Sequence, residues 1–463
     1  MADAPSDTPV HIPSPADPTG WHFETMQVQA GHTPDSDTGA RAIPIYQSTS
    51  FVFPDAQEAA DRFALKSLGP IYTRLDNPTN QIVARRIAAL EGGIGAHLVS
   101  SGMAAQALTF TTLGGQGSNI VASPSLYGGT VNQLKHALPK LGIETRFVSD
   151  PADPAAWTAQ ADERTICFFG ESIPNPKGDI LDIEAIAQAA HALGIPLVVD
   201  NTVASPYLIR PFEWGADIVV HAATKFLGGH GSTVMGVIVD SGNFDFASQP
   251  ERFPDFNTPD PSYNGLVYAR DLGVDSPLGN MAFILRAHTA GQRDLGFAAS
   301  PTESFLIAQG VETLSLRMER HVDNALAVAK WLEGQPEVAE VRYSGLESSP
   351  YYQLHRKYCP RGAGSVFAFD LAGGREAGAA FIDALGLFSN LANIGDVRSL
   401  AVHPATTTHS QLSDDELARA GISAGTVRLS IGIEHVEDII ADLARGLAAT
   451  TEIGRNNHRV RSK

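Results

Sequence analysis

Residues 195–225 read IPLVVDNTVASPYLIRPFEWGADIVVHAATK and contain the clearest indication of the fold. The apolar runs 195–199 and 216–220 predict two strands buried on both faces, as in a parallel sheet. The first run ends in Asp200, and the second leads to Lys225. Because ligands bind at the carboxyl ends of strands in such sheets, the pattern predicts a carboxylate and an amine at one edge, where a cofactor can be held covalently.

The flanking sequence continues an alternation of helices and short apolar strands. Asn77 and Pro78 predict the start of a helix, and Gly92 predicts its end. Further strands are expected at 97–100, 119–122 and 165–169, with another helix at 103–113. This rhythm predicts an α/β fold with a mostly parallel central sheet wrapped by helices.

Composition changes along the 463 residues predict the domain organisation. An amphipathic helix is expected from Val311, with Gly334 as its stop, and a last one at about 436–447. The stretch 240–300 is dense in Pro, Gly and aromatic residues, which predicts an ordered insertion. The expected parts are a disordered lead at 1–20, an N-terminal arm at 21–70, a large domain at 71–310 that includes the insertion, and a smaller C-terminal α/β domain at 311–463.

The charge balance excludes several partners. The chain has 33 basic and 51 acidic residues, a net charge of −18, and no dense block of Lys or Arg. Nucleic acid and anionic membranes are therefore not expected partners. No apolar stretch approaches the roughly 20 residues of a membrane span, and the N-terminus lacks a signal-peptide pattern. We expect a cytoplasmic protein.

Other chemistries have weaker support in the sequence. Cys167 and Cys359 are too few for a disulfide framework or a thiolate metal cage, and are expected to be reduced and structural. Four histidines could suggest a metal hydrolase: His221, His230, His403 and His409. They lack HExxH spacing, so no catalytic metal is expected, and the chain has neither GxxxxGK nor a strand followed by GxGxxG.

Two segments resemble a known family. GADIVVHAATKFLGGHG at 215–231 is similar to the cofactor-lysine segment of the pyridoxal 5′-phosphate (PLP) enzymes of cysteine and methionine metabolism, and LVVDNTVASPYLIRP at 197–211 is similar to their pyridine-binding strand. The resemblance extends from about residue 24 to 454. It implies the aspartate-aminotransferase fold, known as fold type I, with PLP bound as a Schiff base with Lys225. It also implies that Asp200 keeps the pyridine nitrogen protonated.

The resemblance also implies a phosphate site. In the family's SGM segment the backbone of Gly102 and Met103 holds the phosphate at a helix N-terminus, and the hydroxyl of Thr224 contributes. Tyr72 and Arg74 in IYTRLDNPTN match the YxR motif, which reaches the phosphate of a neighbouring subunit. The implied assembly is a homo-oligomer, usually a dimer of dimers, with the arm contributing to its contacts.

The remaining site residues follow from the same resemblance. Tyr127 matches the tyrosine that stacks on the cofactor, and Asn175 matches the asparagine near its ring hydroxyl. Arg428 matches the arginine that clamps the substrate α-carboxylate, with Ser399 as its neighbour. The resemblance implies that Lys225 moves protons between carbon atoms of the substrate, and that Tyr127 and Tyr72 are secondary acid–base groups. Asp200 completes the set of catalytic residues. The chain departs from the family at Ala222, where a phosphate-binding serine is usual.

Three segments resemble the O-acetylhomoserine sulfhydrylase branch of the family: 24–53, the insertion with RFPDF and PDPSYNGLVY, and LANIGDVRSLAVHPATTTHSQLS at 391–413. This implies γ-replacement, in which O-acetyl-L-homoserine and sulfide or a thiol give L-homocysteine or methionine and acetate. The alternatives are cystathionine γ-synthase, which generally lacks the insertion, and a γ-lyase, although methionine γ-lyase carries a cysteine in place of Gly129.

Overall fold

The computed structural model describes residues 13–67, 69–174, 178–407 and 423–461, without the side chains of 452–461. Asn175, His409 and residues 1–12 of the expected lead lie outside the described residues. Within these ranges no helix is long and apolar enough to cross a membrane.

The central sheet has seven strands: β1 (Gly95–Val99), β2 (Asn119–Ala122), β3 (Glu144–Phe147), β4 (Thr165–Glu171), β5 (Leu197–Asp200), β6 (Ile218–Ala222) and β7 (Gly236–Asp240). Their order is β1-β7-β6-β5-β4-β2-β3. The run from β6 to β3 is parallel, whereas β7 is antiparallel to both β6 and β1. The expected mostly parallel sheet is confirmed. The carboxyl ends of β4, β5 and β6 therefore meet at one edge.

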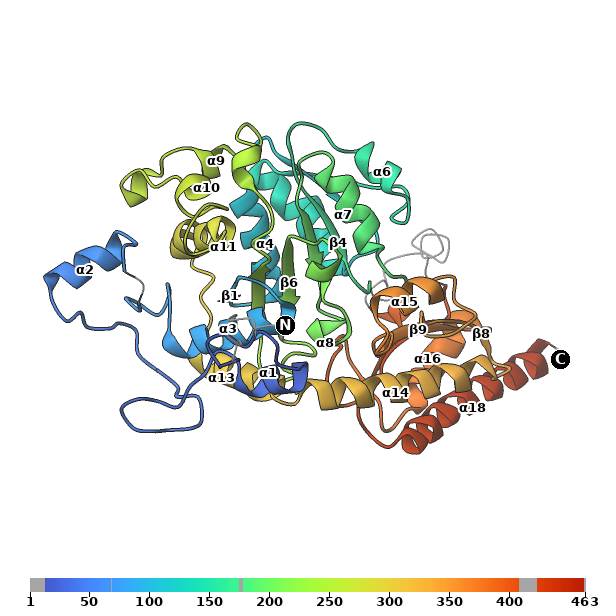
Figure 1. Cartoon of the computed structure of the whole chain (residues 1–463). Coiled ribbons are helices and arrows are strands. Elements are labelled where there is room, and N and C mark those ends of the chain that lie inside the picture. Colours follow the sequence, from blue (N-terminus) through green and yellow to red (C-terminus); the bar gives the residue numbers. More distant parts are fainter. Residues whose placement is uncertain (1–12, 68, 175–177, 408–422, 462–463) are drawn as a thin grey trace, which may run out of the picture.

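Helices cover both faces of this sheet (Figure 1). One hydrophobic cluster joins α3 (Pro78–Glu91) and α7 (Ile183–His191) to one face, and a second joins α4 (Gly102–Leu113) to the other. The prediction of α3 is confirmed at both ends. Asn77 accepts a hydrogen bond from the Thr79 amide, and Gly92 ends the helix at a φ of 81°, which favours glycine.

The second sheet consists of β8 (Val338–Arg342), β9 (Val366–Leu371), β10 (Ser389–Asn390), β11 (Leu400–Val402) and β12 (Thr426–Ser430). Its order is β10-β11-β12-β9-β8, and all pairs except β10-β11 are antiparallel. Three helices pack with it around a third hydrophobic cluster: α14 (Leu314–Glu333), α16 (Gly374–Ala384) and α18 (Val436–Arg461). Figure 1 shows α14 running from beneath the central sheet to this second one.

Two expected helix boundaries are wrong. Val311 ends α13 (Pro301–Val311), and α14 begins after Thr313. Apolar side chains on both sides of this break are buried in one cluster, so the periodicity of the sequence continues through it. The last helix, α18, extends to Arg461 instead of stopping near Leu447, the last residue of its buried stripe.

The insertion folds into short helices around an aromatic cluster. Phe246, Phe253, Phe256 and Phe283 are all at most 3% exposed, and the rings of Phe246 and Phe256 stack with centroids 4.2 Å apart. The helices of this region are α9 (Pro254–Asn257), α10 (Tyr268–Asp271), α11 (Ala282–Arg286), a π-helix (Ala287–Gln292) and α12 (Arg293–Leu295). The shorter helices elsewhere are α1 (Phe23–Gln29), α2 (Ala56–Phe63), α5 (Gly128–Asn132), α6 (Pro154–Thr158), α8 (Ser205–Leu208) and α15 (Tyr352–Tyr358).

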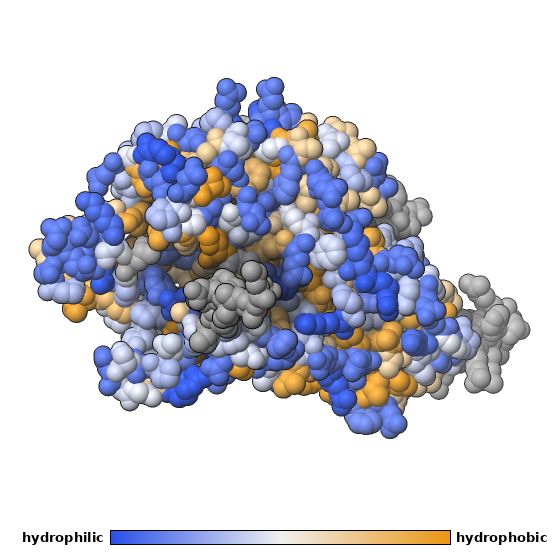
Figure 2. Space-filling view, viewed as in Figure 1, coloured by the Kyte–Doolittle hydropathy of each residue, from blue (hydrophilic) through white to orange (hydrophobic). Residues whose placement is uncertain are grey.

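The segment that carries α2 projects from the body of the molecule (Figure 1). Figure 2 shows orange hydrophobic residues among the blue hydrophilic ones at this end. Val52 is 92% exposed and Phe63 is 63% exposed. Large apolar side chains in such positions are typical of a surface that contacts another protein.

Candidate active site

A cavity of about 300 Å³ opens where the carboxyl ends of β4, β5 and β6 meet the start of α4 and the second sheet. Its lining comes from segments far apart in the chain: Ser101, Gly102, Met103, Gln106, Tyr127, Glu171, Ile173, Asp200, Thr202, Val203, Ala222, Thr224, Lys225, Val234, Ala392, Asn393, Ile394 and Arg428. Seven of the site residues expected from the sequence lie together here: Gly102, Met103, Tyr127, Asp200, Thr224, Lys225 and Arg428.

Lys225 lies in the turn that follows β6, where its amide donates to the carbonyl of Ala222 over 3.0 Å. Its Nζ donates a hydrogen bond to Oδ1 of Asn393. Burial lowers the pKa of Lys225, and the charge of Arg428 lowers this pKa further. A lysine of lowered pKa supplies more neutral amine near neutral pH, as a nucleophile or a proton acceptor requires.

Asp200 is the last residue of β5 and is 9% exposed. Its Oδ2 accepts a hydrogen bond from Nε2 of Gln106 at 2.9 Å. Its Oδ1 accepts from both the amide and the hydroxyl of Thr202, at 3.0 and 2.5 Å. These three donors hold a carboxylate in the cavity wall in one orientation.

The start of α4 approaches β6 and β7 very closely. Ser101 caps the helix by accepting from the Ala104 amide, which leaves the first N–H groups of the helix facing the cavity. A Cβ atom at Gly102 would lie 2.6 Å from Cβ of Ala222, and one at Gly236 would lie 2.0 Å from the carbonyl oxygen of Ser101. Glycine is therefore required at both positions for this approach.

Thr224 lines the cavity, but its hydroxyl also bonds the backbone of Met235. The hydroxyl accepts from the Met235 amide at 2.9 Å and contacts its carbonyl oxygen at 3.3 Å. Tyr127 is 56% exposed, and its amide donates to Oε1 of Glu171 at 2.5 Å. The Tyr127 ring lies against Gly129, where a Cβ atom would come within 2.4 Å of it.

Arg428 on β12 enters the cavity from the second sheet, and its Nη2 donates to the carbonyl of Asn393 at 3.0 Å. Burial lowers its pKa to about 10. Ser399 is fully buried and does not line this cavity. Its hydroxyl donates to Oε2 of Glu434 at 2.9 Å and accepts from the Gly432 amide, so within one chain it has structural partners.

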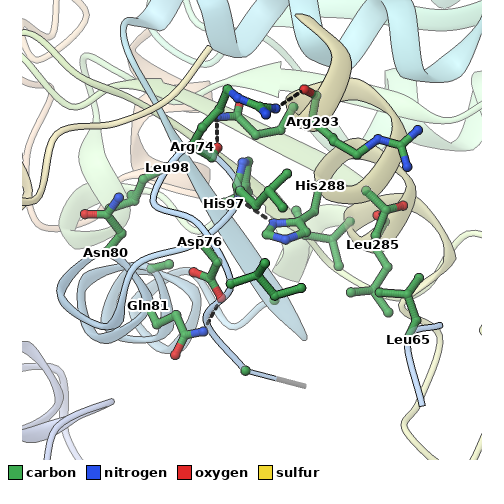
Figure 3. Close-up of a pocket in the computed structure, with 18 of the residues that line it drawn as sticks. Leu65, Arg74, Asp76, Asn80, Gln81, His97, Leu98, Leu285, His288 and Arg293 are labelled. Carbon is green, nitrogen blue, oxygen red and sulfur yellow. Dashed lines mark hydrogen bonds between the residues drawn. The ribbon is translucent and has the colours of Figure 1, made fainter. Parts of the chain in front are cut away.

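Tyr72 and Arg74 do not reach the Lys225 cavity of their own chain. Tyr72 is 41% exposed, and the guanidinium of Arg74 donates to the carbonyl of Arg293. Arg74 lines a different cavity, of about 370 Å³, which also contains the paired side chains of His97 and His288 (Figure 3). The two residues expected at a neighbouring subunit are therefore separated from the other site residues.

Sequence reasoning missed several residues of the cavity. Gln106 stands one helical turn after Gly102 on α4, a spacing that could have placed both on one face. Glu171 ends β4 and satisfies the same strand-end rule that identified Asp200. Asn393 had no periodic signal, because the chain bends there between two short strands. Within the described ranges no three His, Cys, Asp or Glu side chains gather as a metal site would require.

The residues of the cavity fit PLP. They provide an amine, a buried carboxylate and a tyrosine ring at the mouth of the cavity. They also include a helix N-terminus, where Gly102 allows the close approach of the backbone. A lysine and an aspartate at the ends of parallel strands, beside a helix N-terminus, form the cofactor edge of a fold type I PLP enzyme. The chain belongs to the family of Cys/Met metabolism PLP-dependent enzymes, which matches residues 24–448.

Known members of the family are similar over nearly the whole chain. The O-acetyl-L-homoserine sulfhydrylase of Corynebacterium glutamicum is 49% identical, over 93% of this chain and 97% of its own. O-acetyl-L-homoserine sulfhydrylase 1 of Thermus thermophilus is also 49% identical, over 92% of this chain and 100% of its own. A solved structure of a putative O-acetylhomoserine (thiol)-lyase from Campylobacter jejuni has a TM-score of 0.87 and 38% identity, covering 92% of this chain and 100% of its own. It contains a lysine joined to pyridoxyl phosphate.

Proposed function

We propose that this protein converts O-acetyl-L-homoserine and sulfide, or a thiol, to L-homocysteine, or methionine, and acetate. The observation that carries the proposal is the meeting of Lys225, Asp200 and Arg428 in one cavity. The names of the similar proteins support the substrate. These names do not favour the alternatives from the same family, cystathionine γ-synthase and a γ-lyase.

In the proposed reaction Lys225 holds the cofactor, Asp200 faces the pyridine nitrogen, and the N–H groups of Gly102 and Met103 face the phosphate. Bound PLP with a protonated pyridine nitrogen withdraws electrons from the α-carbon of the substrate. Thr224 contributes to the phosphate site, and Asn175 is proposed near the ring hydroxyl.

The substrate is held by Arg428, whose guanidinium forms a fork that matches the α-carboxylate; Ser399 is proposed to support it. The freed Nζ of Lys225 takes the α-proton and then helps to move a β-proton, after which acetate leaves the γ-carbon. Sulfide or a thiol adds at that carbon, and the proton transfers reverse. The Tyr127 phenol, at the mouth of the cavity, is proposed as a further acid–base group.

We also propose that Tyr72 and Arg74 complete the phosphate site of a second copy of the chain, within a dimer of dimers to which the N-terminal arm contributes contacts. The exposed apolar side chains of the arm support this, and so does the place of Arg74 in a cavity other than that of Lys225. Mixing inactive Arg74→Ala and Lys225→Ala proteins under conditions that exchange subunits should restore part of the activity. No recovery in exchanged mixed oligomers would contradict a shared site.

The substrate is tested by measuring acetate release from O-acetyl-L-homoserine, with sulfide, methanethiol or cysteine as the second substrate. The proposal predicts homocysteine from sulfide or methionine from methanethiol. Efficient cystathionine formation from cysteine without a response to sulfide would instead indicate cystathionine γ-synthase.

A further inference from the structure

A second, fully buried polar network lies directly behind the cofactor edge. Oε1 of Glu91, at the end of α3, lies 2.6 Å from Nε2 of His221 and accepts a hydrogen bond from Nδ2 of Asn201 at 2.9 Å. Oδ1 of Asn201 in turn accepts from the Ser172 hydroxyl at 2.8 Å. All four residues are at most 1% exposed. Removing a carboxylate such as that of Glu91 from water costs free energy, which is a reason to ask what the network does.

Its members alternate with residues of the cofactor cavity. Ser172, Asn201 and His221 each adjoin a cavity residue in the sequence, and these neighbours are Glu171, Asp200 and Ala222. His221 and Ala222 are successive residues of β6, whereas Ser172 and Asn201 directly follow β4 and β5 and still donate amide hydrogen bonds to the neighbouring strand. Because successive side chains of an extended segment point to opposite faces, the cavity residues face one way and the network residues the other. The peptide linking Asp200 to Asn201 is thus held from both sides.

We propose that Glu91 is a positioning residue for the cofactor. Its carboxylate holds Asn201 and His221 together, and so sets the ends of β5 and β6 that carry Asp200 and lead to Lys225. Oε2 of Glu91 and Nδ1 of His221 have no hydrogen-bond partner within the described residues, so Oε1 alone links the carboxylate to the two side chains. This link adds to the backbone pairing of β5 with β6 and to the hydrogen bond from the Ala222 amide to the Thr202 hydroxyl. The inference rests on the proposed contact of Asp200 with the cofactor.

The same two strands contain a matched control at their opposite ends. Asp217, just before β6, is 2% exposed, and its Oδ2 lies 2.8 Å from both Nε2 of His191 and the amide of Leu197, the first residue of β5. This pair also joins a buried carboxylate to a histidine, but it does not line the cofactor cavity. If the Glu91 network only stabilises the fold, removing Glu91 and removing Asp217 should therefore have the same effects.

The test compares Glu91→Ala, Glu91→Gln and Asp217→Ala, each loaded with PLP. The readouts are the melting temperature, the rate of cofactor dissociation and the pH titration of the cofactor's visible absorbance, none of which requires O-acetylhomoserine. Glu91→Ala removes the contacts of Oε1 with both His221 and Asn201. It should release the cofactor about tenfold faster and should shift the titration. Glu91→Gln keeps an acceptor at Oε1 and should restore both values. Asp217→Ala should lower the melting temperature while leaving both unchanged.

Two results would overturn the inference. One is a Glu91→Ala protein whose cofactor dissociation rate and absorbance titration equal those of the wild type. The other is an Asp217→Ala protein in which both quantities change as much as they do in Glu91→Ala. If Glu91→Ala does not fold, Ser172→Ala replaces it, because that change removes only the outer hydrogen bond to Asn201. Ser172→Ala should then move the dissociation rate in the same direction by a smaller factor, and an unchanged rate would count against the proposal.

Discussion

Lys225 donates a hydrogen bond from Nζ to the side-chain oxygen of Asn393. Arg428 donates to the backbone carbonyl of the same residue, so the amine and the guanidinium enter the cavity side by side. Two cations at one point are tolerated only if one of them readily loses its proton or an anion binds between them. The arrangement thus favours a neutral lysine and an anionic substrate.

Arg428→Gln should raise the pKa of Lys225, because it removes the positive charge that helps to lower it. Burial is the larger cause and is unchanged, so the pKa should remain below the value of a free lysine, about 10.4. The check is the pH dependence of Lys225 acylation in the cofactor-free protein. A midpoint that stays in place or moves to lower pH would contradict this reasoning.

Asp240→Asn should change how stability depends on pH. Burial raises the pKa of Asp240 to about 7. Between the unfolded value, about 3.9, and this value, the folded protein binds the extra proton, so the wild type loses stability as pH rises through that window. Asparagine does not titrate. The unfolding free energy of the variant relative to wild type should therefore rise between about pH 4 and pH 8, and urea unfolding at several pH values would measure it.

Gly129→Ala should displace the Tyr127 ring, because the new Cβ atom would lie 2.4 Å from Cε1 of that ring. The expected result is a lower kcat with a changed visible spectrum of the bound cofactor. Gly128→Ala is the control, since a Cβ atom there meets nothing within 4 Å. If the two variants have the same kcat and the same cofactor spectrum, Gly129 does not help to place the tyrosine.

Ala222→Ser should slow cofactor dissociation. The Cβ atom of Ala222 lies beside Gly102 at the start of α4, so a hydroxyl added there stands next to the proposed phosphate site. A hydrogen bond to a charged group contributes roughly 1.5 to 3 kcal/mol, which is about tenfold or more in rate. Stopped-flow transfer of cofactor to an apo acceptor protein measures the rate; equal or faster release from the serine variant would contradict the expectation.

Local rules of sequence predicted the architecture well. Asp200 and Lys225 could be placed together because the strand-end rule depends only on the apolar runs before them. Arg428, by contrast, lies about 200 residues away in the sequence on another sheet, and only resemblance to the family connected it to Lys225. Periodicity also failed at Val311, because two helices share one buried face.

The network behind the cofactor edge was beyond sequence reasoning. His221 looked like one histidine among several, and nothing local links it to Glu91, 130 residues earlier. Such a pair depends on which helix packs against which strand in the folded sheet, and the sequence pattern did not specify this arrangement. The pairing of Lys225 with Asn393 across 168 residues is of the same kind.

Lys225 is proposed to be the cofactor lysine of an O-acetylhomoserine sulfhydrylase. The most direct measurement compares purified wild type and Lys225→Ala, both incubated with PLP, by visible absorbance after dialysis and by sulfide-dependent acetate release from O-acetyl-L-homoserine. We expect the wild type to keep the absorbance and to form homocysteine, and the folded variant to do neither. A Lys225→Ala protein that still forms homocysteine, or a wild type that cannot be loaded with PLP, would contradict the proposal.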